Sequence, residues 1–336
     1  SPPFITSTMQ QEASRKLGFT TKKTMIVAQQ LYEGVNIKGV GAAGLVTYIR
    51  TDSTRVSGDA QENAAEYIAN KYGGEYVPKK RPVYKGKSSS QDAHECIRPT
   101  SPDMDPQSIK DSLSREQYRL YKLVWERFIA SQMAPAIYDT VSSDIGVGKY
   151  IFRASGSSIK FRGFTILYQE GTDDTKEQSD TNIPELIENE KLKKESIEPK
   201  QHFTQPPPRY TEASLVKTLE EKGIGRPSTY APTITTILAR GYILKDGRTL
   251  IPTELGMIVT DIMKNYFKEI VDVKFTAQLE EKLDKVEEGQ KKWVDVMKNF
   301  YPRFEEVLKE AESKIGNIEI PDEVTDEICE KCGRNM

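Results

Sequence analysis

Residues 44–57 read Gly-Leu-Val-Thr-Tyr-Ile-Arg-Thr-Asp-Ser-Thr-Arg-Val-Ser, and this stretch decides how the rest of the chain is interpreted. Its apolar residues favour a short β-strand over positions 45–49. Side chains two apart in a strand share a face, which predicts that Tyr48 and Arg50 lie together. A phenol beside a fixed guanidinium can attack phosphate, because the cation favours phenolate and holds phosphate oxygens. Such a tyrosine can also be an ordinary half-buried sheet residue, so spacing alone leaves both interpretations open.

Four blocks of sequence resemble one known family, in the order of that family. They are residues 3–34, 44–57, 93–99 (Ala-His-Glu-Cys-Ile-Arg-Pro) and 206–242. They resemble the bacterial type IA DNA topoisomerases, and residues 44–57 look like the active-site signature. The resemblance implies an ATP-independent isomerase that cleaves one DNA strand through a 5′-phosphotyrosyl intermediate, passes another strand and religates, which relaxes negatively supercoiled DNA. No P-loop motif is present, in agreement with ATP independence.

The resemblance also implies roles for individual residues around the signature. Tyr48 takes the position of the nucleophile and Arg50 that of the phosphate clamp. His94 matches the family histidine near the active tyrosine, which implies a contact with phosphate or DNA, whereas a histidine outside such a motif more often serves packing. Arg98 of the same block is implied to contact DNA. Cys96 stands where the family usually has a small residue such as alanine.

The resemblance of the last block implies a groove for single-stranded DNA. A turn over residues 223–230 leads into a helix that we expect Ser228 to cap, so backbone N–H groups and hydroxyls can converge on phosphate. Arg240 follows Arg226 by about four helical turns, which predicts a shared face. The resemblance assigns both arginines to the groove, and Tyr230 can stack on a base. The predicted DNA-binding residues are Arg98, Arg226, Ser228, Thr229, Tyr230 and Arg240.

Periodicity predicts a multidomain, mainly α-helical chain with a β-rich segment. Helices are expected over residues 5–34, 59–71 and 114–132, and antiparallel strands over 139–167. Two helices, a hairpin at Asp246-Gly247 and a further helix then follow in a winged-helix-like order. The resemblance implies what these segments are. They correspond to a helical domain carrying the tyrosine (1–134), part of a β-rich hinge domain (135–204) and a winged-helix-like domain that binds single-stranded DNA (205–318), and we expect an acidic linker with the truncated start of a zinc ribbon at 319–336.

Charge and composition restrict the function only weakly. The net charge is −2, yet residues 1–100 hold 14 Lys and Arg against 9 Asp and Glu, so local fields can still attract DNA. No apolar run approaches the roughly 20 residues that span a bilayer, and three cysteines make no disulfide framework. The cysteine count favours a cytoplasmic protein, and the absence of an apolar span argues against a membrane. The resemblance implies a nucleoid-associated monomer that acts on single-stranded and negatively supercoiled DNA without a nucleotide cofactor.

Two metals are implied by the resemblance. Cys329 and Cys332 form a CxxC pair, half of a possible Zn²⁺ site of a C-terminal ribbon; a redox pair is the alternative. Mg²⁺ is implied to be held by the family's toprim domain, whose Glu…Asp-x-Asp-x-Glu arrangement does not occur in these 336 residues. The chain begins at a serine and stops after the CxxC, so we expect a central and C-terminal core fragment without the toprim domain.

Two classes of function remain in competition. The first is a type IA topoisomerase whose fragment binds single-stranded DNA without relaxing supercoils when alone. The second is a non-catalytic single-stranded DNA-binding scaffold, in which the same blocks act only as a clamp. Retention of both Tyr48 and Arg50 favours the enzyme, and the missing toprim residues favour the scaffold for the fragment. A reverse gyrase or decatenating relative is a weaker third reading, since no helicase motif is present.

Overall fold

The computed structural model of the chain describes residues 1–84, 94–172, 183, 186–316, 328 and 331–333. The chain divides into two compact units. Unit 1 comprises Ser1–Glu220 and Arg226–Thr235, and unit 2 comprises Glu221–Gly225 and Thr236–Met336. This division does not follow the four domains expected from the sequence, whose boundaries stay a prediction. No described helix has the length and apolar composition needed to cross a membrane.

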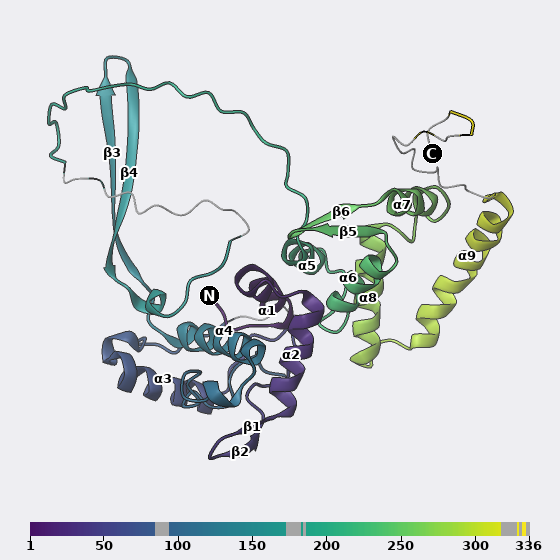
Figure 1. The fold of residues 1–336 in the computed structure, drawn as a ribbon, viewed down its shortest axis with the longest axis horizontal. Coiled ribbons are helices and arrows are strands. Elements are labelled where there is room, and N and C mark those ends of the chain that lie inside the picture. Colours follow the sequence, from purple (N-terminus) through teal and green to yellow (C-terminus); the bar gives the residue numbers. More distant parts are fainter. Residues whose placement is uncertain (85–93, 173–182, 184–185, 317–327, 329–330, 334–336) are drawn as a thin grey trace. The chain divides into compact units, whose positions relative to one another are not determined.

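The buried core of unit 1 is built on helices (Figure 1). The helices are α1 (Thr6–Glu12), continued by the π-helix η1 (Ala13–Leu17), α2 (Thr21–Glu33), α3 (Gly58–Tyr72) and α4 (Arg115–Gln132). They confirm the helices predicted over residues 5–34, 59–71 and 114–132. Ser114 caps α4 by accepting a hydrogen bond from the backbone N–H of Gln117. Tyr121 and Phe128 on the apolar side of α4 are fully buried.

The stretch that carries Tyr48 is not the strand that we predicted. After α2 comes a small antiparallel hairpin of β1 (Val35–Ile37) and β2 (Gly41–Ala43), and residues 44–57 then follow without helix or strand. Within this fully described stretch only Val46 makes a β-bridge, to Pro99. Its backbone groups bond to several separate segments, so no continuous ladder forms.

A long antiparallel ribbon follows α4 (Figure 1). It consists of β3 (Ile137–Val147) and β4 (Tyr150–Phe161), closed by a two-residue turn that begins with Gly148. This confirms antiparallel strands in the predicted segment. Apolar side chains such as Ile151 and Phe152 are exposed on the ribbon. A two-stranded ribbon is marginally stable by itself, so its attachment to the helices matters.

A buried polar cluster holds the chain where it leaves the ribbon. Glu12 is only 4% exposed, and its carboxylate accepts hydrogen bonds from the Tyr168 hydroxyl (2.6 Å) and the Gly171 N–H (3.0 Å). Arg127, 3% exposed, pairs with Glu170 at 2.6 Å. Because buried charges are costly unless they are paired, these contacts fix the exit of the ribbon on α1 and α4.

The C-terminal elements follow the predicted order of two helices, a hairpin and further helices. The hairpin turns at Gly247, whose φ of 58° suits the first position of a tight two-residue loop. A Cβ atom at Gly256 would lie 2.0 Å from the carbonyl oxygen of Tyr242, so only glycine permits this approach. The elements are α5 (Glu212–Glu221), α6 (Tyr230–Ala239), β5 (Ile243–Asp246), β6 (Thr249–Pro252), α7 (Glu254–Tyr266), α8 (Val273–Glu287) and α9 (Trp293–Lys314).

Candidate functional site

Tyr48 and Arg50 are both exposed although no strand forms. Leu45 and Ile49 are fully buried in the core of unit 1, whereas Tyr48 is 38% exposed and Arg50 is exposed. The buried side chain between them therefore directs both functional groups outward. Within the described residues the Arg50 guanidinium makes no hydrogen bond or ion pair, which leaves it available to an anion.

Thr6 of α1 holds the segment from one side. Its hydroxyl donates to the carbonyl oxygen of Ile49 at 2.7 Å and accepts from the N–H of Thr51 at 2.9 Å. The N–H of Thr6 also donates to the carbonyl oxygen of Thr51 at 2.9 Å. Ile5 is the N-cap residue of α1, so the Thr6 side chain is used for these long-range bonds and not as a helix cap.

The block around His94 holds the segment from the other side. The N–H of Thr47 donates to the carbonyl oxygen of Arg98 at 2.9 Å, and the Thr47 hydroxyl donates to that of Cys96 at 2.7 Å. Two of the four sequence blocks are thereby joined directly at the nucleophile candidate. Burial raises the pKa of the Cys96 thiol to about 12, so this residue serves as a small packed side chain and not as a thiolate.

Two aromatic rings flank Tyr48. His94 lies 5.2 Å from the Tyr48 ring, centroid to centroid, with 31° between the planes. Tyr32, at the end of α2, meets it edge-on at 5.6 Å and is itself 39% exposed. The sequence reasoning identified His94 and missed Tyr32. A signal existed, because Tyr32 is the next-to-last residue of α2, the helix that precedes the active-site block.

Arg98 does not present a free guanidinium. Its Nε and Nη2 atoms bond to Glu95 at 2.8 and 2.7 Å, and its Nη1 donates to the carbonyl oxygen of Pro99 at 3.1 Å. As placed, Arg98 orders the loop that carries His94. Its predicted contact with DNA stays a prediction.

Gly44 lets the segment pass close to the end of α2. A Cβ atom at this position would lie 2.8 Å from the backbone carbonyl oxygen of Tyr32, which cannot turn aside as a side chain could. We expect Gly44→Ala to lower the free energy of unfolding by about 1–3 kcal/mol, measured by denaturant titration. Gly58→Ala, where a Cβ atom meets nothing within 4 Å, is the control and should unfold like the wild type. Equal stability of the Gly44 and Gly58 variants would contradict the proposed close packing.

The residues of the last block form a local turn before α6. The N–H of Arg226 donates to the Thr229 hydroxyl at 2.8 Å, and the N–H of Thr229 donates to the Arg226 carbonyl oxygen at 2.9 Å. Ser228 and Thr229 are exposed, as a phosphate contact requires. Tyr230 is only 6% exposed, so its ring, as placed, offers no face to a base.

The structure does not support the argument that placed both arginines on one helical face. We expected a helix from Ser228, but α6 begins at Tyr230 and ends at Ala239. Arg226 precedes the helix and Arg240 follows it, so helical periodicity does not relate them. Arg240 is exposed and belongs to unit 2, while Arg226 belongs to unit 1. Their joint role in a groove stays a prediction.

The described residues contain no group of three or more His, Cys, Asp or Glu side chains that could hold a metal ion. The described part of the chain therefore does not fit the implied Mg²⁺. Cys332 is exposed with a free thiol, and Cys329 lies outside the described residues. The half-site for Zn²⁺ stays a prediction.

The comparison with known proteins agrees with the blocks that meet at Tyr48. A family model described as DNA topoisomerase matches residues 1–298. The chain belongs to the bacterial type IA DNA topoisomerase family. Its fold is similar to a solved structure of full-length topoisomerase I from Thermotoga maritima, with 40% sequence identity and a TM-score of 0.79. The match covers 100% of this chain and 53% of the Thermotoga chain, so the chain spans about half the length of that topoisomerase.

Proposed function

We propose that this chain is the nucleophile-bearing part of a type IA DNA topoisomerase. The observation that carries the proposal is the exposed phenol of Tyr48, which His94 flanks, on a segment that Thr6 and Thr47 anchor and that also exposes Arg50. Membership of the topoisomerase family supports an isomerase that acts on DNA. The proposal extends to cleavage of one strand, passage of another and religation, in a cytoplasmic, nucleoid-associated monomer.

In the proposed reaction the phenol oxygen of Tyr48 attacks a phosphorus atom of the DNA backbone. A tyrosyl O–P bond forms while the bond from phosphorus to the 3′ oxygen breaks. The phenol loses one proton and the departing 3′ oxygen gains one, so the exchange of one phosphodiester for another is balanced. Religation reverses the same bonds. No nucleotide is consumed, because the energy of the broken bond is kept in the 5′-phosphotyrosyl link.

Arg50 and His94 are proposed to stabilise the scissile phosphate. Arg50 can hold two phosphate oxygens at once and neutralise charge that develops in the transition state. The imidazole of His94 lies against the Tyr48 ring and is proposed to add a hydrogen bond or positive charge at the same phosphate. Any Mg²⁺ is proposed to belong to a toprim domain of the family.

The predicted groove can be tested through the salt dependence of single-stranded DNA binding. Arg226→Ala and Arg240→Ala should each weaken binding of single-stranded DNA, and each should reduce the slope of log K against log salt by about 0.7, the value of one phosphate contact. Arg153→Ala is a suitable control, because Arg153 is exposed on β4 and already pairs with Asp144 at 2.7 Å. Oligonucleotide binding at several salt concentrations measures all three variants. An unchanged slope in both groove variants would remove the groove assignment.

The 336-residue chain by itself should bind single-stranded DNA and leave plasmid supercoiled, even with Mg²⁺. Positioning and fixed charges supply much of the rate of phosphate-ester chemistry, and this sequence lacks the acidic toprim arrangement. The assay is plasmid relaxation with material free of host topoisomerase. A chain that joins residues 1–336 to a toprim domain of the family is the positive control. Robust relaxation by the 336 residues alone would contradict this prediction, and failure to bind single strands would contradict the proposed function itself.

A further inference from the structure

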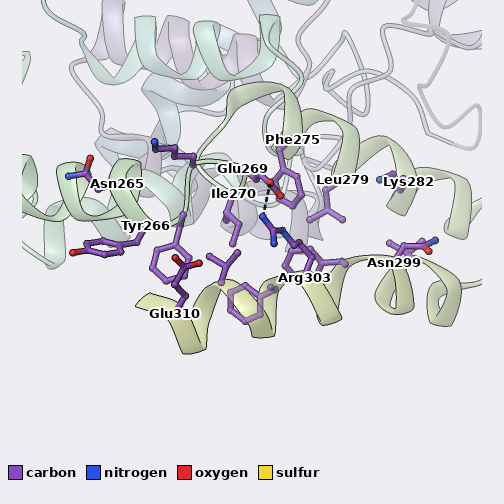
Figure 2. Close-up of a pocket in the computed structure, with 16 residues that line it drawn as sticks. Asn265, Tyr266, Glu269, Ile270, Phe275, Leu279, Lys282, Asn299, Arg303 and Glu310 are labelled. Carbon is purple, nitrogen blue, oxygen red and sulfur yellow. Dashed lines mark hydrogen bonds and ion pairs between the residues drawn. The ribbon is translucent and has the colours of Figure 1, made fainter. Parts of the chain in front are cut away.

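Helices α8 and α9 of unit 2, with the loop before α8, line a cavity of about 330 Å³ (Figure 2). This volume lies at the lower end of the range for small-molecule sites. Leu279 of α8 and Val307 of α9 belong to its apolar lining, and Arg303 of α9 pairs across it with Glu269 at 3.5 Å. The cavity combines apolar and aromatic side chains with charged groups, as ligand sites commonly do.

Three phenylalanine rings form one wall of this cavity. Phe275 and Phe300 lie 5.9 Å apart, centroid to centroid, and Phe300 stacks on Phe304 at 5.5 Å with 20° between the planes. All three side chains line the cavity and are only partly buried. Partly exposed aromatic rings are the side chains on which unpaired bases stack.

A second cavity, of about 450 Å³, adjoins the first at the turn between α8 and α9. Lys282 and Asn299 are among the residues that line both. The second lining includes Lys282, Lys291 and Lys292 against one carboxylate, that of Asp295. Within the described residues none of these three ammonium groups is paired with a carboxylate. This lysine corner is complementary to a phosphate.

We propose that the two cavities form a subsite for one nucleotide of single-stranded DNA. The base lies against the wall of Phe275, Phe300 and Phe304, and the neighbouring backbone phosphate lies at the lysine corner. The inference rests on the proposed function, because it requires that the chain binds single strands. It extends that function to a surface of unit 2 outside the block that carries the predicted groove arginines.

The chemistry favours a nucleic acid strand over an acidic peptide. A peptide of glutamates can bind the lysine corner but has no planar group for the aromatic wall. A free nucleotide has both groups, yet a strand offers several phosphates to three lysines and gains from their combined attraction. Polyglutamate and a free nucleotide are therefore useful competitors in an oligonucleotide-binding assay.

Photocrosslinking locates the base directly. A thymidine oligonucleotide with one iodouracil is irradiated on the whole 336-residue chain, and the crosslinked peptides are identified by mass spectrometry. We expect crosslinks at Phe275, Phe300 or Phe304. Crosslinks confined to other segments overturn this subsite and leave the proposed function standing. The absence of any crosslink, together with no measurable binding, overturns both.

Matched variants test the two halves of the subsite. Phe300→Leu keeps an apolar side chain and should weaken oligonucleotide binding about five-fold or more. Phe203→Leu is its control, since Phe203 is exposed on a segment without helix or strand. Lys291→Gln with Lys292→Gln should reduce the salt slope by about 0.7 or more. Lys309→Gln, on α9 but in neither lining, should change nothing.

An oligonucleotide of equal length made only of abasic nucleotides separates base stacking from phosphate binding. Its binding should keep its dependence on Lys291 and Lys292 and lose its dependence on Phe300. Unfolding curves of all variants verify that the fold is intact. The proposal is overturned if Phe300→Leu, folded like the wild type, binds the normal oligonucleotide unchanged. It is also overturned if polyglutamate or thymidine monophosphate displaces the oligonucleotide at concentrations near the oligonucleotide's own Kd.

Discussion

Tyr48→Phe should abolish relaxation of supercoiled DNA while single-strand binding stays within a few-fold of the wild-type value. The substitution removes the oxygen that is proposed to form the bond to phosphorus and keeps the ring that packs between Tyr32 and His94. Relaxation is measured in a chain that joins residues 1–336 to a toprim domain of the family. Oligonucleotide binding is measured on the same protein.

The comparison with Tyr32→Phe distinguishes chemistry from packing. Tyr32 is also exposed and also contacts this aromatic cluster, but it is not proposed to attack phosphate. Tyr32→Phe should therefore keep most of the relaxation activity. A Tyr48→Phe enzyme that still relaxes supercoils would remove Tyr48 from the mechanism.

Arg50→Ala should lower the rate of strand cleavage by on the order of 10²–10³-fold, the usual cost of removing one donor that stabilises transition-state charge. Arg50 is exposed and is not part of the core, so the free energy of unfolding should stay near that of the wild type. Cleavage of a labelled oligonucleotide under single-turnover conditions measures the rate without the later strand-passage steps.

Arg50→Lys tests whether the geometry of the guanidinium matters in addition to its charge. Lysine keeps the charge but cannot bond two phosphate oxygens through a planar fork. We expect a cleavage rate between those of Arg50→Ala and the wild type. Full activity in Arg50→Lys would show that charge alone suffices, and full activity in Arg50→Ala would exclude Arg50 as the phosphate clamp.

Local periodicity predicted most of the helices because their apolar faces and caps lie within a few residues of one another. The capped helix α4 and the ribbon of β3 and β4 are examples. The strand at Tyr48 was predicted wrongly because the same alternation of buried and exposed side chains arises here without a strand partner. The burial pattern was predictable, whereas the backbone conformation depends on bonds to distant residues such as Thr6 and Arg98.

Dependence on distant residues also explains why the contacts that hold the Tyr48 segment were not predicted. The contacts of Thr6 with Ile49 and of Thr47 with Cys96 span more than forty residues of sequence, and no local pattern encodes them. Tyr230 shows the converse, since a tyrosine in a DNA-binding motif suggested stacking on a base and the structure buries it. Motifs indicate which residues matter, and tertiary packing decides which of them reach a ligand.

Identification of the amino acid that becomes linked to DNA tests the central claim most directly. Residues 1–336 joined to a toprim domain are mixed with a labelled oligonucleotide, the reaction is stopped with denaturant, and the peptide that keeps the label is sequenced by mass spectrometry. The account predicts a 5′-phosphate on Tyr48, and no labelled peptide from Tyr48→Phe. A DNA link to any other residue, or cleavage without a covalent link, would contradict it.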